Sequence, residues 1–567
     1  MHFKEKVFGK VNMITFQFLC IFVSIFALTR CSNQPQVTIF QGTLKGFYLK
    51  TLNNRSIASF EGIPFAKPPI GENRFKKPIA ADPWYGILNA TREPPICLQY
   101  DFFIHPPVLS GSEDCLFINV YTPKLPTGEE KPKLLDVLAF IHGGAFVTGK
   151  SLSYKPFVLL DRDILLVTFN YRLGPLGFLS TEDDVVPGNN GLKDQVLALQ
   201  WIKKNIAAFG GNPEKVTIAG LSAGGASCHF HTLSPLSRGL FKGAICLSGI
   251  ALNPMTVTNS IEKAKMIANE LGCLTNDSLL MINCLRNRPA EHIVELTKKL
   301  LVWRSHPMVP FGPVIEPVGP DAFISEKPIN IIGRRAAADV PMIISFTSDE
   351  GLVGVTDIVS NAELFNELLN RWDELMPHMM GYNFKESFDK MEISRKIREY
   401  YKIDDITNGR KNLIKMVGDR YFLAGISKLA KLHLSFNSAP MYIQKFSYRG
   451  KHSVTELLNV KENLGVCHGD DVFYTVRDYG VWKQFEEPMD AEMSECMIDM
   501  WISFAANGTL DEKWHPLNKK DLKIIFTDIK GPNTLKLSMA DELGEESFWD
   551  SLGLNENIEP TLSHVEL

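Results

Sequence analysis

The sequence predicts an α/β fold with a large, mostly parallel central sheet that is flanked by helices and interrupted by long loop and helical insertions. Short apolar runs rich in β-branched residues are typical of buried strands, and they recur at 134–141, 164–170, 215–219, 243–248 and 341–346. A helical pattern separates two of these runs, and alternation of strand and helix favours parallel pairing. The 567 residues contain no repeat or low-complexity linker. We therefore expect one large unit with insertions.

Composition excludes several classes of protein. The chain is 45% hydrophobic and 22% charged, with a formal net charge of -4 and a pI near 6.4. Neither a polybasic surface for nucleic acid nor an acidic tail is visible. The ten cysteines form no C-x-x-C motif and accompany no paired histidines, so we expect no metal site among them. We expect no cofactor either.

The N-terminus has the pattern of a secretory signal peptide. Lys4, Lys6 and Lys10 precede an apolar run at 13–28, and small or polar residues follow it. We expect residues 1–31 to be the signal peptide and 32–567 a single domain; an uncleaved signal anchor is the alternative. No later segment is apolar enough to span a bilayer.

In an exported protein, cysteines can form disulfides and sequons can be glycosylated. Cys97 with Cys115 and Cys273 with Cys284 are close pairs in polar, loop-like surroundings, and a disulfide closes loops of this size easily. Four other cysteines lie in apolar runs and are expected to be buried free thiols: Cys228, Cys246, Cys467 and Cys496. The predicted glycan acceptors are Asn54, Asn89, Asn276 and Asn507.

The first predicted strands lead to a glycine-rich loop. A small hairpin is expected over 37–49, extended chain over 57–66 and a strand over 116–121. The strand at 134–141 then runs into HGGAF. Two glycines at a strand end can turn their amides toward a ligand, so Gly143 and Gly144 are candidate oxyanion donors; a plain glycine-rich turn is the alternative.

The central element is the stretch KVTIAGLSAGG at 215–225. A strand ends and a helix begins around Ser222, with Gly220 and Gly224 two residues to either side, where a sharp turn leaves no room for a Cβ. Such a turn exposes the Ser222 hydroxyl at the positive end of the helix and directs the Ala223 N–H to the same space. The geometry predicts a nucleophile.

A base and an acid follow in the order that this chemistry requires. The strand at 341–346 ends just before Asp349 and Glu350, at the sheet edge that carries Ser222. The run at 440–448 is interpreted as the last core strand, and it leads through a loop to His468. The order serine, acid, histidine is that of a hydrolytic triad. Asp349 remains the alternative acid because it is adjacent to Glu350.

These residues carry a resemblance to a known family. The chain resembles the type-B carboxylesterase and cholinesterase family of α/β-hydrolases, particularly its insect esterases, from about residue 37 to about residue 517. The motifs that carry the resemblance are EGIPFAKPP, SEDCLFINVYTP, HGGAF, NYRLGPLGFLS, GNNGLKDQ, GLSAGG, SDEG, CHGDD and WISFAANGTL.

The resemblance implies an α/β-hydrolase fold and a role for each site residue. By this likeness Ser222 is the nucleophile, Glu350 the acid and His468 the base, with oxyanion donors at Gly143, Gly144 and Ala223. It also implies the disulfides Cys97–Cys115 and Cys273–Cys284 and an ion pair between Arg74 and Glu113.

Two departures from the family pattern matter. Leu221 stands where the family usually has a carboxylate just before the nucleophile, so the hydrogen bonding of that side chain is missing. The stretch between Cys97 and Cys115 contains no Trp, whereas cholinesterases bind choline there through a cation–π contact. This difference argues against a cholinesterase.

The expected function is a serine carboxylic ester hydrolase that cleaves small to medium apolar esters through an acyl-enzyme on Ser222. The alternatives are a juvenile-hormone-type or lipid esterase, or a catalytically weak binding or adhesion member of the family. The terminal residues His564, Val565, Glu566 and Leu567 resemble an H-D-E-L retrieval signal. They predict a retrieval receptor as partner and residence in the endoplasmic reticulum lumen, with secretion as the alternative.

Overall fold

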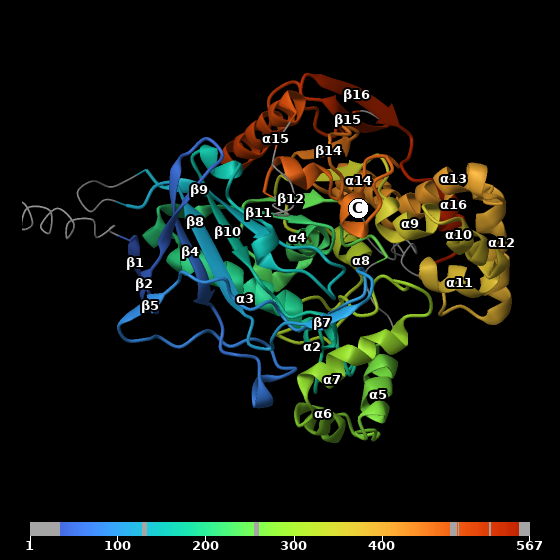
Figure 1. The fold of residues 1–567 in the computed structure, drawn as a ribbon, viewed down its shortest axis with the longest axis horizontal. Coiled ribbons are helices and arrows are strands. Elements are labelled where there is room, and N and C mark those ends of the chain that lie inside the picture. Colours follow the sequence, from blue (N-terminus) through green and yellow to red (C-terminus); the bar gives the residue numbers. More distant parts are fainter. Residues whose placement is uncertain are drawn as a thin grey trace, which may run out of the picture.

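The centre of the molecule is an 11-stranded sheet with the strand order β16-β15-β14-β13-β12-β11-β9-β10-β8-β4-β3 (Figure 1). The computed structural model describes residues 34–126, 133–254, 260–476, 485, 487–520 and 523–554. The predicted signal peptide and the C-terminal HVEL lie outside these residues.

The middle of this sheet is parallel, as the sequence predicts. Its parallel strands are β9 (Leu135–Ile141), β10 (Ile164–Phe169), β11 (Gly211–Leu221), β12 (Gly243–Leu247), β13 (Met342–Thr347), β14 (Met441–Phe446) and β15 (Ile524–Gly531). Antiparallel strands extend both sides of the sheet, namely β16 (Thr534–Ala540), β8 (Phe117–Thr122), β4 (Ser56–Pro64) and β3 (Phe47–Lys50). The sheet is therefore mixed, with a parallel core.

Two strand predictions need correction. The run at 440–448 is not the last core strand, because β15 pairs with it and β16 follows β15. The hairpin expected over 37–49 is divided between two sheets. Its first part, β1 (Gln36–Ile39) and β2 (Gly42–Lys45), joins β5 (Ile87–Asn89) in a small sheet of its own, while β3 belongs to the central sheet.

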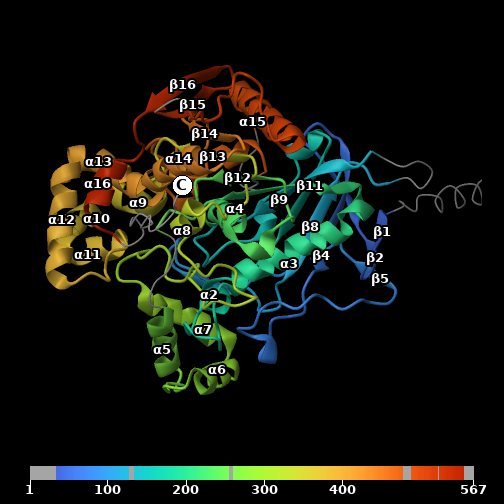
Figure 2. The ribbon, with the colours of Figure 1, turned by 180° about the vertical axis from the view of Figure 1, so that it is seen from behind.

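Alternate residues of β9 show that both faces of the sheet are buried. Val137 and Ile141 pack in the cluster that contains residues of α3 (Asn190–Asn205) and α4 (Ala223–Leu233), whereas Phe140 packs with Trp501 of α15 (Pro488–Asn507). Successive side chains of a strand point to opposite faces. Figure 2 shows α3 lying across the strands on its face. A continuous apolar run in the sequence therefore indicated a strand covered on both sides.

Helical insertions follow β12 and β13. The first contributes α5 (Ser260–Glu270), α6 (Ser278–Arg286), α7 (Ala290–Glu295) and α8 (Pro328–Gly333). The second contributes α9 (Leu352–Val359), α10 (Ala362–Asn370), α11 (Trp372–Met379), α12 (Ser387–Tyr401), α13 (Ile406–Gly418) and α14 (Ala424–Phe436). In Figure 1, α5 to α7 form a lobe below the sheet and α10 to α13 gather at its right. A π-helix, η7 (Asp419–Leu423), joins α13 to α14.

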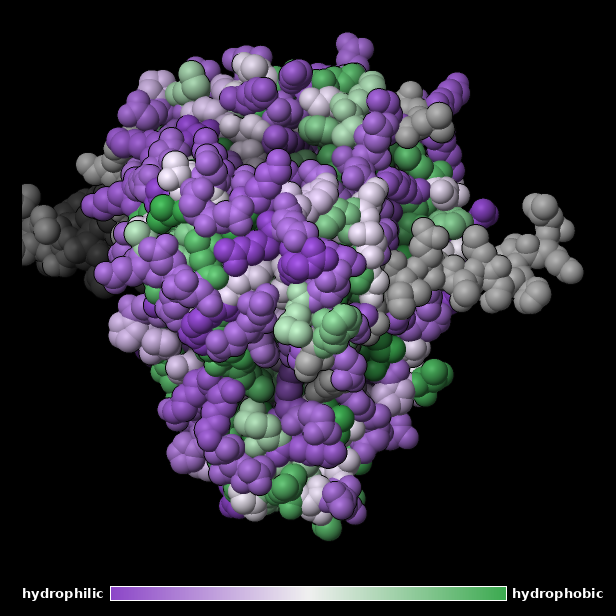
Figure 3. Space-filling model, turned by 90° about the vertical axis from the view of Figure 1, so that its right-hand side faces the viewer, coloured by the Kyte–Doolittle hydropathy of each residue, from purple (hydrophilic) through white to green (hydrophobic). Residues whose placement is uncertain are grey.

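The surface beside the second insertion is mostly hydrophilic. Figure 3 shows this side of the molecule with scattered hydrophobic patches among hydrophilic side chains. Within the residues that the structure describes, no helix is both long enough and apolar enough to cross a membrane.

Candidate active site

Ser222 occupies the sharp turn between β11 and α4 that the sequence predicts. Its backbone has φ 59° and ψ −121°, a conformation that L-residues adopt only under strain and that persists where the surroundings enforce it. Close packing of backbone enforces it here. A Cβ on Gly224 would lie 2.1 Å from the Ile141 carbonyl oxygen, and one on Gly220 would lie 2.4 Å from the Gly224 carbonyl carbon. Both positions therefore require glycine, because a Cβ would collide with neighbouring backbone atoms.

Glu350 and His468 form a buried pair at the same edge of the sheet. Glu350 follows β13 in a turn, His468 lies in the loop after β14, and they are 1% and 5% exposed. The Nδ1 atom of His468 donates to the Glu350 Oε2 atom at 2.6 Å. The other carboxylate oxygen accepts bonds from the Thr347 N–H at 2.7 Å and the Ser248 hydroxyl at 2.5 Å. These contacts fix the carboxylate and, through it, the imidazole.

The second nitrogen of His468 is available for chemistry. Among the residues described, its Nε2 atom is buried and has no hydrogen-bond partner. His468 and Ser222 line the same cavity. The ring of Phe422 packs against the imidazole with 4.8 Å between centroids. Sequence, topology and packing therefore bring the three predicted residues Ser222, Glu350 and His468 to one site.

The predicted oxyanion donors lie beside the nucleophile. A Cβ on Gly143 would be 3.1 Å from the Ser222 Cβ, so the glycine loop passes directly against the elbow. The Gly143 N–H points to the Tyr154 hydroxyl at 3.4 Å. Gly144 has φ 111°, and Ala223 is the first residue of α4, where N–H groups have no acceptor within the helix.

His142, which begins this glycine loop, is held in place by Tyr171. Its ring stacks on Tyr171 at 4.3 Å, and the Tyr171 hydroxyl donates to the His142 carbonyl oxygen at 3.0 Å. Burial lowers the pKa of His142 to about 4. The histidine therefore stays neutral at physiological pH and adds no charge next to the oxyanion donors.

Asp349 does not pair with His468. Its Oδ2 atom accepts hydrogen bonds from the Val466 N–H at 2.9 Å and the Ser348 hydroxyl at 2.6 Å. Asp349, the alternative acid of the sequence analysis, thus links the turn that carries Glu350 to the loop that carries His468. A third carboxylate, Asp471, is buried and accepts from the Ser345 hydroxyl at 2.9 Å; burial and then the charge of Glu350 raise the pKa of Asp471 to about 6.

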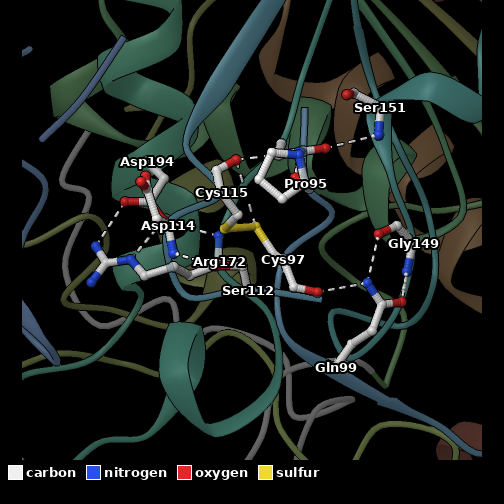
Figure 4. Close-up of a disulfide and its surroundings, with 11 residues drawn as sticks. Pro95, Cys97, Gln99, Ser112, Asp114, Cys115, Gly149, Ser151, Arg172 and Asp194 are labelled. Carbon is white, nitrogen blue, oxygen red and sulfur yellow. Dashed lines mark hydrogen bonds and ion pairs between the residues drawn. A yellow bond between two sulfur atoms is a disulfide. The ribbon is translucent and has the colours of Figure 1, made fainter. Parts of the chain in front are cut away.

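Both expected disulfides are present, Cys97–Cys115 and Cys273–Cys284. Figure 4 shows the first one together with Gln99 and Gly149. From the hairpin that it encloses, the Gln99 side chain donates to the Cys97 and Gly149 carbonyl oxygens at 2.8 and 3.1 Å and accepts from the Gly149 N–H at 2.8 Å. The disulfide loop is therefore attached to the chain that follows the glycine loop.

The remaining structural predictions are met with one exception. Arg74 and Glu113 form a two-bonded ion pair with both N–O distances 2.6 Å. Three of the predicted thiols are buried, whereas Cys496 is only half-buried and packs at the margin of the core cluster that contains Trp501. The four sequon asparagines Asn54, Asn89, Asn276 and Asn507 are exposed, as acceptors must be.

The cavity has a volume of about 460 Å³. Its walls include three elements that the sequence analysis did not identify. They are the hairpin of β6 (Gln99–Asp101) and β7 (Val108–Ser110), the π-helix η7, and the 3-10 helix η8 (Val454–Leu458). Apolar side chains dominate the lining: Ile96, Phe103, Ile104, Val108, Leu221, Met308, Val309, Val353, Phe422, Val454, Leu457 and Leu458. No local motif marks such walls, because they join only in the folded chain.

Leu221 is part of this apolar lining. It is 3% exposed and borders the cavity next to the nucleophile. The position that carries a carboxylate in the family pattern therefore contributes here to apolar surface.

A strained serine elbow, a buried Glu–His pair and a glycine loop at the carboxyl edge of this sheet define an α/β-hydrolase. A model described as the carboxylesterase family matches residues 33–546. The chain therefore belongs to the carboxylesterase family and is a serine ester hydrolase.

Individual esterases are similar to this chain over most of its length. The chain is 39% identical to venom carboxylesterase-6 of Apis mellifera over 557 residues, covering 96% of this chain and 99% of that protein. It is 34% identical to juvenile hormone esterase of Tribolium castaneum over 512 residues, covering 86% of each. The crystal structure of juvenile hormone esterase from Manduca sexta, with OTFP covalently attached, matches with a TM-score of 0.80 and 29% identity, over 92% of this chain and all of that one.

Proposed function

We propose that the protein cleaves small to medium apolar carboxylic esters with Ser222 as nucleophile, His468 as general base and acid, and Glu350 as the group that orients the imidazole. The observation that carries the proposal is the 2.6 Å contact between Glu350 and His468, together with the position of His468 and Ser222 on the lining of one cavity. The α/β-hydrolase fold and the carboxylesterase match support it.

Acylation follows from this arrangement. The Nε2 atom of His468 takes the Ser222 proton as the oxygen attacks the ester carbonyl. The N–H groups of Gly143, Gly144 and Ala223 then stabilise the oxyanion, which the positive end of α4 also favours. For Gly143, the substrate oxygen replaces the long 3.4 Å contact with Tyr154. His468 returns the proton to the leaving alcohol.

Deacylation repeats these steps with water. His468 removes a proton from the water that attacks the acyl-enzyme, and then protonates Ser222 as the acid leaves. Glu350 holds the imidazole through Nδ1 in both halves and stabilises its charged form. The carboxylate can do so because Thr347 and Ser248 already anchor its other oxygen.

The lining of the cavity supports an apolar substrate. About 460 Å³ bordered mainly by aliphatic and aromatic side chains accommodates apolar acyl and alcohol groups of moderate length. A juvenile-hormone-type ester is the second candidate. It is favoured by the likeness to two proteins named juvenile hormone esterase.

Hydrolysis of p-nitrophenyl esters from acetate to decanoate, by wild type beside Ser222→Ala, tests this proposal. We expect turnover by the wild type, a maximum at short to medium chains, and loss of nearly all turnover in the variant. Preferential cleavage of a juvenile hormone over these esters would support the second candidate. A folded Ser222→Ala protein with undiminished turnover would refute the assignment of the nucleophile.

We also propose the cellular route from the two chain ends. Residues 1–31 act as a cleaved signal peptide, residues 32–567 form the mature single domain, and the exposed acceptors Asn54, Asn89, Asn276 and Asn507 carry glycans. The tail HVEL then returns the protein to the endoplasmic reticulum lumen. Deletion of the last four residues should release the protein into the medium, and retention of the shortened protein in the cell would contradict the retrieval signal.

A further inference from the structure

Asp470, two residues after His468, connects the histidine loop to a wall of the cavity. Its carboxylate is 3% exposed and accepts bonds from two separate segments. The Cys467 N–H donates to Oδ2 at 2.8 Å, and the Val454 N–H donates to Oδ1 at 2.7 Å. The Ser453 hydroxyl lies 3.1 and 2.9 Å from the two oxygens. One side chain thus holds both segments.

The first of these segments positions the catalytic imidazole. Cys467 immediately precedes His468, so its N–H bond to Asp470 fixes the backbone that carries the ring. A second carboxylate, Asp349, holds the same loop one residue earlier, through the Val466 N–H. The two carboxylates differ in what else they contact: the other side-chain donor to Asp349 is the neighbouring Ser348.

The second segment is η8. Val454, Leu457 and Leu458 of this short helix line the cavity. A capping box between Ser453 and Glu456 closes its first turn. We therefore treat η8 as a small rigid unit. Its first residue, Val454, is attached to the histidine loop through the hydrogen bond from its N–H to Asp470.

The charge of Asp470 is poorly compensated. Burial raises the pKa of Asp470 to about 7, and Arg449 is the cationic group that acts on it in the opposite direction. Burial first, and then neighbouring charges that include Asp470, raise the pKa of Cys467 and of Tyr474, so both stay neutral and neither group adds a compensating positive charge. Retaining a buried carboxylate at this position costs stability, which the hydrogen bonds from its three donors, the Val454 and Cys467 N–H groups and the Ser453 hydroxyl, offset in part.

We infer that Asp470 is a positioning residue that couples the alignment of His468 to the chain-length preference of the cavity. The inference rests on the proposed function of the site. Because one carboxylate anchors both η8 and the histidine loop, a change at Asp470 moves the wall that the substrate meets together with the base. A change at Asp349 reaches the histidine loop without touching η8.

Asp470→Asn and the matched control Asp349→Asn test the inference. Each is assayed with p-nitrophenyl esters from acetate to decanoate, which vary the acyl group, and with alkyl butyrates, which vary the alcohol. Asparagine keeps one acceptor oxygen and turns an NH2 group toward a backbone N–H. We expect kcat to fall by about 10-fold for both variants, the size of effect of one lost bond to a charged group.

The ratio of kcat/KM for long and short chains separates the two variants. For Asp470→Asn we expect this ratio to shift by about 3-fold or more in one of the two series, which is a fraction of the roughly 10- to 200-fold effect of one methylene in an apolar pocket. For Asp349→Asn it should equal the wild-type ratio. Equal ratios in wild type and both variants would overturn the inference, and so would an equal shift in both variants.

A third variant covers the case in which Asp470→Asn does not fold. Ser453→Ala removes the hydroxyl contact with Asp470 and the side-chain cap of η8, and it leaves the Cys467 contact. It should therefore shift the chain-length ratio with a smaller loss of kcat. An unchanged ratio would count against the inference. Turnover by the wild type and its loss in Ser222→Ala test the proposed function separately. A failure of the proposed function can therefore be distinguished from a failure of the inference about Asp470.

Discussion

Replacing Gly143 by alanine should damage catalysis through geometry alone. Gly143 lies outside the left-handed backbone region, so alanine introduces no backbone strain. A Cβ there would lie 2.6 Å from the Leu221 carbonyl oxygen and 3.1 Å from the Ser222 Cβ. Both neighbours belong to the strained elbow and have little freedom to move. The glycine loop and the elbow must therefore separate.

The required displacement sets the expected effect. An ordinary contact of a Cβ is about 3.4 Å or more, so the loop must move by roughly 0.8 Å relative to the nucleophile. Misplacement by about 1 Å costs on the order of 10²-fold in rate, and removal of one oxyanion donor costs about 10²- to 10³-fold. We expect kcat of Gly143→Ala to fall about 10²-fold, with KM changed much less because the apolar walls remain.

Steady-state kinetics with p-nitrophenyl butyrate, together with thermal unfolding, measures this effect. Gly319→Ala is the matched control, since a Cβ on Gly319 meets no atom within 4 Å and its φ is not positive. That variant should behave as wild type. A Gly143→Ala enzyme whose kcat is within 2-fold of the wild-type value would refute the reasoning, because the loop could then open without consequence.

Three further predictions concern the base, its packing and the buried histidines. Glu350→Gln should lower kcat about 10⁴-fold without unfolding, since it removes the charge that selects the imidazole tautomer; kinetics beside thermal melts will show this, and a loss below 10-fold would contradict it. Phe422→Ala should lower kcat/KM for apolar esters by about 10-fold or more, because its ring packs on His468 and lines the cavity; an unchanged value would exclude that role. Burial lowers the pKa of His231 to about 3 and of His306 to about 4. These groups stabilise the fold fully above about pH 6.5, and that stability is lost as the pH falls toward the folded values because the unfolded chain binds their protons first. At pH 5 each should cost about 2 kcal/mol, so Tm should fall below pH 6.5 and fall less steeply in His306→Gln; equal slopes would disprove this.

The sequence predicts those parts of the site that depend on local geometry. The elbow around Ser222 needs small residues where backbone segments meet, and these leave a visible spacing of glycines. The buried strands leave continuous apolar runs because helices cover both of their faces. His468 could be found by its place after a strand. Glu350 and Asp349, in contrast, could be ranked only by resemblance, since their different partners arise from tertiary structure.

Features formed by distant segments could not be read in this way. The sequence does not reveal β15 and β16 as strands because polar residues such as Asp528 and Lys536 interrupt their apolar runs, although Gly531 and its neighbours form a hairpin turn that was available as a signal. The cavity walls are built from loops far apart in the chain. The contacts of Asp470 with Cys467 and Val454 have no signature in the spacing of residues.

The π-helix η7 makes the number of residues between α13 and α14 important for the active site. An α-helix turns about 100° per residue, and a π-turn accommodates one more residue than an α-turn. Deleting Asp419, Arg420 or Leu423 would let α13 run into α14 as a regular helix and would rotate Phe422 away from His468, even though the cavity-lining side chains of Tyr421 and Phe422 were retained. Insertions and deletions at this point should therefore abolish activity that point substitutions nearby would spare.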